Sequence, residues 1–331
     1  MARSKGQKAI VGVDLGGTSI YAAVVDAGDG RVLGTAKRKT RAERGASIVV
    51  DRLLATIERA ISASGLSQKA ILGLGIGVPG PVDPPKGLVV RCPNLGPTWD
   101  NFYLGDELTR RLGKPVVVNN DVNVGAVGEH RHGAGRGTRD MLAIFVGTGI
   151  GGGLILGGKL YAGCRNSAAE VGHMVIEAEG ALCGCGERGH AEALASRTAI
   201  ERYIREALAA GQPSIIPELR QKAKGDLLTA GIIGDAYDAG DLVTISAVRR
   251  AQYYLGLLLA SCVNFFDPEK IVIGGGLLER MGDAYLEPVR ETAQQHYINK
   301  HNLDRVAIVR ARLGDQAGAI GAAELAKQRL K

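Results

Sequence analysis

The chain has 331 residues, 45% of them hydrophobic, so it is long enough to bury a sizeable core in one large domain or in two. Its net charge of +7 could indicate a nucleic-acid partner, but the positive residues are scattered and aromatic residues make up only 4%. The densest basic run, at positions 37–44, is short and is interpreted as a solvated strand edge, so no nucleic-acid partner is expected.

Targeting and redox signals indicate the cytoplasm. The uncharged run from Ala251 to Phe266 is too short to span a bilayer, and the basic N-terminus lacks the apolar stretch of a signal peptide. Cys92, Cys164 and Cys262 are isolated from one another in the sequence, as free thiols are in a reducing compartment. We therefore expect a cytoplasmic protein without a membrane partner.

The first predicted strands are echoed later in the chain. The segment AIVGVDLGGTSIYAAVVDAGDGRVLG begins at Ala9, and LAIFVGTGIGGGLILGGKLYAG begins at Leu142. Each contains an apolar strand, a glycine-rich turn with threonine, a second strand, a tight turn and a third strand. The repeat predicts a duplicated α/β fold with a β-meander opening each half and a cleft between the halves.

Helices are expected between and after the strands. Apolar residues between positions 50 and 61 keep helical spacing, and Gly65 suits the position just after a helix end. Three further helices are predicted: a buried one over Leu242–Phe266, one opened by Pro288 and running towards His296, and an alanine-rich one from Gly318.

The two glycine-rich turns are candidate phosphate sites. Asp14 ends the first strand and is followed by Gly16, Gly17 and Thr18, while Gly147, Thr148 and Gly149 form the second turn. Glycines let backbone N–H groups converge on an anionic oxygen, and two such hairpins can grip a polyphosphate from both sides. Asp14 would then approach a phosphate-bound Mg²⁺, through water. Either turn alone is equally compatible with an ordinary hairpin.

A third glycine turn, formed by Gly274, Gly275 and Gly276, lies between a predicted strand and a predicted helix. Small residues there would let a flat ring approach the backbone, as an adenosine platform requires. A simple strand-to-helix turn explains the same residues nearly as well.

Asn120 and Asp121 follow a buried-type strand at 116–118. The carboxyl ends of strands are where α/β proteins place ligand contacts, so Asp121 is a candidate to accept a proton from an alcohol. The alternative is that Asp121 only caps the helix that begins near Val122.

A metal site is predicted from the spacing H-x₉-C-x-C-x₄-H, formed by His173, Cys183, Cys185 and His190. Four such ligands suit tetrahedral Zn²⁺ and leave no position for an activated water, so the metal would be structural. The alternative is a metal-free loop. The same loop carries Glu170, His173 and Glu192, which could hydrogen-bond to a polyol.

These motifs together resemble the repressor, open reading frame and kinase (ROK) family, and its bacterial glucokinases in particular. The resemblance covers nearly the whole chain. It rests on DLGGTS, GVPGPVD at Gly77, PNL with Trp99 nearby, NDVN at Asn120, GAGRG at Gly133, GTGIGGG at Gly147, the His/Cys stretch, DPEKIVIGGG at Asp267 and LGDQAGAIGAA at Leu313.

The resemblance implies a two-domain actin-like ATPase fold and a homodimer or dimer of dimers. The smaller domain is expected at 1–119 with 315–331, and the larger at 120–314. By resemblance Asp121 is the catalytic base, and the phosphates lie at the two glycine hairpins with adenosine at the Gly274 turn. The residues implied to contact the sugar are Gly80, Asn94, Asn120, Asp121, Glu170, His173 and Glu192.

The chain departs from the family pattern at His190, where cysteine is usual, and zinc is expected to be retained more weakly. The predicted reaction is phosphoryl transfer from ATP to the 6-hydroxyl of glucose. N-acetylhexosamine, mannose or fructose remain alternative acceptors, and polyphosphate an alternative donor. A sugar-sensing regulator is less favoured, because only about a dozen residues precede Asp14, too few for a helix-turn-helix domain. A zinc hydrolase is disfavoured by the full ligand set.

Overall fold

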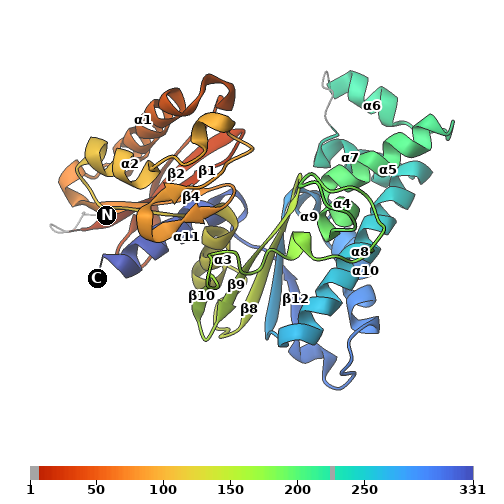
Figure 1. Cartoon of the computed structure of the whole chain (residues 1–331). Helices are drawn as coiled ribbons and strands as arrows, with labels where there is room; N and C mark the ends of the chain where they lie inside the picture. The colour runs from red at the N-terminus through yellow and green to blue at the C-terminus, as the bar shows by residue number, and fades with distance from the viewer. Residues whose placement is uncertain (1–6, 224–227, 331) are drawn as a thin grey trace. The chain divides into compact units, whose positions relative to one another are not determined.

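The computed structural model describes residues 7–223 and 228–330, and it contains two five-stranded sheets flanked by helices (Figure 1). In the first sheet the strand order is β3-β2-β1-β4-β7. An antiparallel β1–β2–β3 meander is extended by β4 and β7, which run parallel to β1. Its strands are β1 (Ala9–Leu15), β2 (Ser19–Asp26), β3 (Val32–Lys39), β4 (Ile71–Val78) and β7 (Val116–Asn120).

The second sheet repeats this plan with the order β10-β9-β8-β11-β12. Strands β9 and β10 pair antiparallel, and β11 runs parallel to both β8 and β12. Its strands are β8 (Met141–Val146), β9 (Ile150–Leu156), β10 (Lys159–Tyr161), β11 (Lys270–Gly274) and β12 (Ala307–Arg310). The predicted duplication of an α/β half that opens with a meander is therefore confirmed. A further small sheet pairs β5 (Val82–Asp83) with β6 (Leu88–Val89).

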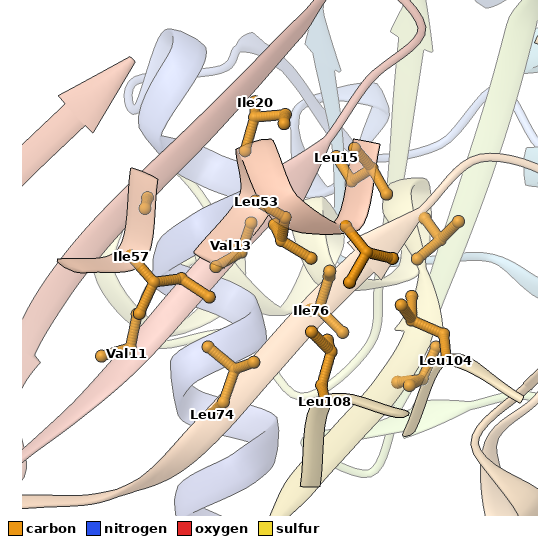
Figure 2. Close-up of a cluster of buried hydrophobic side chains, with 14 of the residues drawn as sticks. Val11, Val13, Leu15, Ile20, Leu53, Ile57, Leu74, Ile76, Leu104 and Leu108 are labelled. Atoms are coloured by element: carbon orange, nitrogen blue, oxygen red, sulfur yellow. The ribbon is translucent and has the colours of Figure 1, made fainter. Parts of the chain in front are cut away.

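Helices cover both faces of the first sheet. Helices α1 (Ala46–Ser64) and α2 (Leu104–Leu112) pack on one face, where Leu53, Ile57, Leu104 and Leu108 meet the side chains of β1 and β4 (Figure 2). All four of these side chains are buried, and each such burial stabilises the fold by about 1.5–3 kcal/mol. As predicted, α1 ends just before Gly65.

Small residues dominate the other face, where α11 (Ala317–Arg329) packs on β1 and β4 and also on α3 (Asp121–His132). A Cβ atom at Gly75 would lie 1.9 Å from the carbonyl oxygen of Ala322, and one at Gly321 would lie 1.7 Å from that of Val124. The backbones therefore approach more closely than any larger residue allows. The predicted alanine-rich terminal helix is confirmed, and it lies at the centre of this unit.

The remaining helices accompany the second sheet. They are α4 (Ala191–Ala195), α5 (Arg197–Ala209), α6 (Ile216–Ala223), α7 (Ala230–Asp238), α8 (Leu242–Phe266), α9 (Gly276–Met281) and α10 (Asp283–Gln295). Helix α8 buries about half of its residues and packs against α4, α5 and α10, as its apolar sequence predicts.

The predicted start of a helix at Pro288 is wrong, because Pro288 lies inside α10. Proline has no N–H and so leaves the carbonyl four residues earlier, that of Ala284, without its helical partner. Gln252 of α8 takes this place: its Nε2 donates to the carbonyl oxygens of Ala284 at 2.9 Å and Tyr285 at 3.0 Å. A tertiary hydrogen bond thus makes an interior proline tolerable.

The chain forms two compact units with bounds that differ from the predicted domains. The first unit comprises 1–140, 153–169 and 312–331, and the second comprises 141–152 and 170–311. The predicted boundary after residue 119 would separate α3 from the first unit. Helix α3 instead stays with it, because a Cβ at Gly128 would lie 2.2 Å from the carbonyl oxygen of Ala317 in α11.

The surface of the fold bears on two expectations from the sequence, the solvated basic run and the lack of a membrane-spanning segment. Strand β3 is an edge strand, and Lys37 and Lys39 are exposed on it, as the interpretation of the basic run predicts. Within residues 7–223 and 228–330, no helix is long and apolar enough to cross a membrane.

Candidate functional site

The first glycine hairpin is a tight and well-braced turn. The N–H of Gly16 donates to the carbonyl oxygen of Ser19 at 2.9 Å. Thr40 braces it from outside, with its Oγ1 donating to the carbonyl oxygen of Gly16 at 2.6 Å and its N–H to that of Thr18 at 2.9 Å. A Cβ at Gly17 would lie 3.0 Å from the carbonyl oxygen of Asn94. The structure therefore brings Asn94 to the hairpin predicted to bind phosphate.

Asp14, just before this hairpin, has a strongly perturbed carboxyl group. Burial, first of all, and then the carboxylates of Asp121 and Asp315 raise the pKa of Asp14 to about 7, against the opposing charge of Lys37. Lys37 also forms an ion pair with Asp315 at 2.6 Å. Carboxylate oxygens are the protein ligands that Mg²⁺ prefers, and three of them against one lysine leave negative charge for a cation to neutralise. The residues present therefore fit a role beside Mg²⁺.

Asn120 and Asp121 form the turn from β7 into α3. The Asn120 side chain is the N-cap: its Oδ1 accepts from the N–H groups of Val122 at 2.9 Å and Asn123 at 3.1 Å. The alternative in which Asp121 caps the helix is therefore wrong, because the N-cap is the preceding residue, Asn120. Asn120 Nδ2 donates to the carbonyl oxygen of Gly80 at 3.2 Å, which places two of the predicted sugar contacts together. Asp121 is the first helical residue.

The second glycine hairpin is tied to the helix that follows the His/Cys stretch. The N–H of Gly147 donates to the carbonyl oxygen of Gly149 at 2.8 Å. The N–H of Ile150 donates to Glu192 Oε2 at 2.9 Å, and a Cβ at Gly149 would lie 2.2 Å from that oxygen. Glu192, a predicted sugar contact, thus adjoins a predicted phosphate contact.

The third glycine turn lies against the end of β8. Gly275, the N-cap of α9, has φ 121°, and a Cβ there would lie 2.0 Å from the carbonyl oxygen of Val146. The positive φ and the close contact with Val146 each require glycine at this position. Val146, Gly147, Gly276 and Leu277 line a pocket of about 230 Å³ together with Arg197, Thr229 and Ala230. The pocket joins the second and third glycine turns, which the sequence predicted to serve one nucleotide.

Arg197 was not predicted as a site residue, although it lines this pocket and binds the second glycine hairpin. Its guanidinium donates to Thr148 Oγ1 at 2.8 Å and to the carbonyl oxygen of Leu228 at 2.8 Å. Its N–H donates to the carbonyl oxygen of Gly147 at 3.0 Å. A single arginine after the N-cap Ser196 carries no sequence pattern that reveals these long-range contacts.

His173, Cys183, Cys185 and His190 form a compact cluster with ligand atoms that all lie within 4.8 Å of one another. His190 Nδ1 lies 3.3 Å from His173 Nδ1 and 3.2 Å from Cys185 Sγ. Tetrahedral zinc separates such ligand atoms by roughly 3.3–3.8 Å, so this donor set fits the ion. His190 lies within this cluster despite the departure from the family pattern.

Backbone hydrogen bonds shape the loop around this cluster. The N–H of Cys183 donates to the carbonyl oxygen of Glu187 at 2.8 Å, and that of Ile176 to Gly189 at 2.9 Å. Gly189 has φ 75°, and a Cβ there would lie 1.8 Å from the carbonyl oxygen of Glu177, so only glycine fits. The loop is therefore fixed by its own backbone on both sides of the two cysteines.

Glu170 and His173 lie at the two ends of one helical turn. Glu170 precedes the 3₁₀ helix Val171–His173 (η5), and both side chains are exposed. Because His173 Nδ1 faces the cluster, its Nε2 is directed elsewhere and can serve a second partner. The predicted sugar contacts of this unit, Glu170, His173 and Glu192, therefore come from one short stretch around the cluster.

Two like sheets, each opening with a glycine hairpin, define an actin-like ATPase fold, as predicted. The ROK family model matches residues 10–329, and the chain belongs to this family. It is 36% identical to a glucokinase of Halalkalibacterium halodurans over 96% of this chain and 94% of that one. It is 37% identical to a glucokinase of Thermotoga maritima, over 97% and 98%. A ROK glucokinase of Streptomyces griseus, crystallised with glucose and AMPPNP, has 37% identity, a TM-score of 0.81 and coverage of 97% and 99%.

Proposed function

We propose that this ROK family member is a sugar kinase that transfers the terminal phosphoryl group of ATP to the 6-hydroxyl of glucose. The observation that carries the proposal is that the carboxylate of Asp121 lies close enough to Asp14 for its charge to raise the pKa of Asp14, beside a glycine hairpin. The glucokinase relatives of the chain support the same function. In this proposal Asp121 accepts the proton of an alcohol, and Asp14 serves the cation that accompanies a nucleotide.

The sugar is assigned to Gly80, Asn94, Asn120, Glu170, His173 and Glu192. Their amide, carboxylate and imidazole groups match the alternating donors and acceptors of a polyol. Asp121 accepts the proton of the attacking hydroxyl. Because phosphoryl transfer proceeds through a loose transition state, this proton leaves late and an ordinary ionised aspartate suffices.

The nucleotide is assigned to the glycine turns. Gly16, Gly17 and Thr18, and likewise Gly147, Thr148 and Gly149, offer backbone and hydroxyl donors to the phosphates. We assign adenosine to the pocket of about 230 Å³ beside Gly276. The predicted adenosine site consisted of Gly274, Gly275 and Gly276, and the pocket adds Arg197 and Thr229 to it. Mg²⁺, when bound with ATP near Asp14, supplies charge neutralisation of the phosphates.

Structural Zn²⁺ is assigned to His173, Cys183, Cys185 and His190. The full ligand set leaves no open position, so the ion contributes shape and no chemistry. Its proposed effect is to fix the stretch that carries Glu170, His173 and Glu192. A homodimer or dimer of dimers is proposed as the assembly, and sedimentation equilibrium of the purified protein tests it.

A coupled assay tests the proposal with a panel of donors and acceptors. Glucose, mannose, fructose and an N-acetylhexosamine are compared with MgATP, and glucose is then compared with ATP and with polyphosphate as donor. Phosphorylation of glucose by ATP with the highest kcat/KM is the expected result. A higher kcat/KM for another hexose would reassign the acceptor. Sugar binding without any phosphoryl transfer would favour the regulator class instead.

A further inference from the structure

A buried carboxylate outside the proposed reaction connects two of the motifs noted in the sequence. Glu129 lies in α3, eight residues after Asp121, and is 0% exposed. Its Oε2 accepts from the N–H of Ala134 at 2.8 Å, and its Oε1 accepts from those of Arg312 at 3.0 Å and Leu313 at 2.8 Å. Ala134 belongs to the GAGRG motif, and Leu313 opens the LGDQAG motif.

The residues around this carboxylate leave room for it and offer it hydrogen-bond donors. A Cβ at Gly133 would lie 2.0 Å from Glu129 Oε2, which explains glycine at the start of the GAGRG motif. An ionised carboxylate without water is costly unless it accepts several hydrogen bonds, and those to backbone N–H groups are the strong, charge-assisted kind. An amide at this position has one acceptor oxygen and would turn an NH₂ group towards the remaining donors.

The turn held by Glu129 leads directly to the residues beside Asp14. Residues 314–316 form a 3₁₀ helix (η7), and α11 begins at Ala317. Asp315 forms the ion pair with Lys37, and its charge acts on Asp14. A Cβ at Gly318 would lie 2.7 Å from Asp14 Cγ, so the start of α11 packs against this carboxyl group.

We propose that Glu129 is a positioning residue for phosphoryl transfer: its carboxylate fixes the turn beside Asp14 relative to the helix that begins at Asp121. The inference rests on the proposed kinase function. Helix α3 is a rigid element over the roughly 12 Å between Asp121 and Glu129, so an anchor at its far end sets the position of its first residue. Arg312 is also the first residue of the C-terminal segment of the first unit, so Glu129 binds the beginning of that segment.

The test compares Glu129→Gln with a matched control, Glu324→Gln. Glu324 lies on α11 and binds His132 of α3, so the control removes a buried carboxylate that links these two helices without touching the turn. For Glu129→Gln we expect kcat to fall about tenfold or more, because small misplacements of reacting groups are costly. Glucose Kd by equilibrium dialysis stays within about twofold, because the sugar contacts other than Asp121 lie outside α3.

Amide hydrogen exchange separates positioning from general stability. In the wild type, the amides of Ala134, Arg312 and Leu313 should exchange as slowly as those of β4. In Glu129→Gln, peptides covering 133–135 and 311–317 should exchange faster while those of β4 do not. The proposal is overturned if Glu129→Gln has the same kcat as the control Glu324→Gln. It is also overturned if the kcat of Glu129→Gln falls while protection against exchange is lost throughout the chain.

If Glu129→Gln does not fold, Glu129→Asp replaces it, since the shorter carboxylate keeps its charge and should show the same local loss of protection. Fast exchange of Arg312 and Leu313 in the wild type overturns the proposal without any variant. A wild type that phosphorylates no hexose refutes the kinase function, and it would also remove the positioning role proposed for Glu129.

Discussion

Glu192 and Ile150 join the His/Cys cluster to the second glycine hairpin. The carboxylate of Glu192 accepts from the N–H of Ile150 at 2.9 Å, and its other oxygen lies 3.6 Å from Cys183 Sγ. Helix α4 begins at Ala191, directly after the cluster residue His190. The position of the cluster therefore determines the position of Glu192 and, through it, the shape of the hairpin.

Gly149→Ala should disturb this junction. Its Cβ would lie 2.2 Å from Glu192 Oε2, so the carboxylate must move away from Ile150. We expect a loss of stability of about 1–3 kcal/mol, measured by chemical denaturation. Gly147→Ala is the control for stability, because a Cβ there meets nothing within 4 Å. Equal stability of the two variants would contradict the close contact.

Zinc content tests the assignment of His190. The wild type should contain about one zinc per chain by elemental analysis, and His190→Ala should lose it, while His296→Ala, a histidine outside the cluster, should not. His190→Cys restores the usual ligand of the family and makes the bound site formally negative instead of neutral, so it should resist a chelator longer. Unchanged zinc in His190→Ala would remove this residue from the ligand set.

Local signals explain why so much of the fold could be predicted. The two glycine hairpins, the spacing of apolar residues in α1 and the alanine-rich α11 are determined by residues close in the chain. Turn chemistry and periodicity report such features directly. The His/Cys cluster was predictable for the same reason, because its ligands fall within His173–His190 and their spacing suits a tetrahedral ion.

Features that depend on distant residues could not be predicted in this way. Pro288 is tolerated inside α10 because Gln252, 36 positions earlier, binds the carbonyl it leaves free. Glu129 accepts from Arg312, 183 positions away. The placing of α3 in the first unit follows from its close contact with α11. No local pattern encodes such pairs, because they exist only once the chain has folded.

Asp121→Asn should leave a folded, glucose-binding protein without effective turnover. An amide cannot accept the hydroxyl's proton, so kcat should fall by about a hundredfold to ten-thousandfold, while glucose Kd stays similar. Asp106→Asn is the control, because Asp106 is an exposed carboxylate in the first turn of α2. Near-native kcat in Asp121→Asn would show that another group serves as base.

Asp14→Asn should stabilise the ligand-free, metal-free protein at alkaline pH. The pKa of Asp14 is raised to about 7 by burial and by Asp121 and Asp315, against the opposing charge of Lys37. The folded state therefore binds more protons than the unfolded state between about pH 4 and pH 7, and its stability falls as pH rises through this window. Asparagine removes a penalty on the order of a few kcal/mol that is complete above about pH 7.

Chemical denaturation of both proteins from about pH 4 to pH 8 measures this difference, which should grow with pH and then level off. Asp26→Asn is a control of opposite sign. The pKa of Asp26 is lowered, first by the hydrogen bond from Gln7, so its carboxylate stabilises the fold at neutral pH and loses that effect on acidification. If Asp14→Asn were less stable than the wild type at about pH 8, the proposed electrostatic strain would be refuted.

Arg197→Lys should weaken nucleotide use without changing glucose affinity. Arg197 lines the proposed adenosine pocket, and its guanidinium bridges Thr148 Oγ1 and the carbonyl oxygen of Leu228. A lysine ammonium cannot hold both acceptors in the same fork geometry, so the hairpin loses its brace. We expect KM for ATP to rise about tenfold with glucose Kd unchanged. Arg205→Lys is the control on the same helix, since Arg205 binds Glu201. Equal KM for ATP in both variants would place the nucleotide elsewhere.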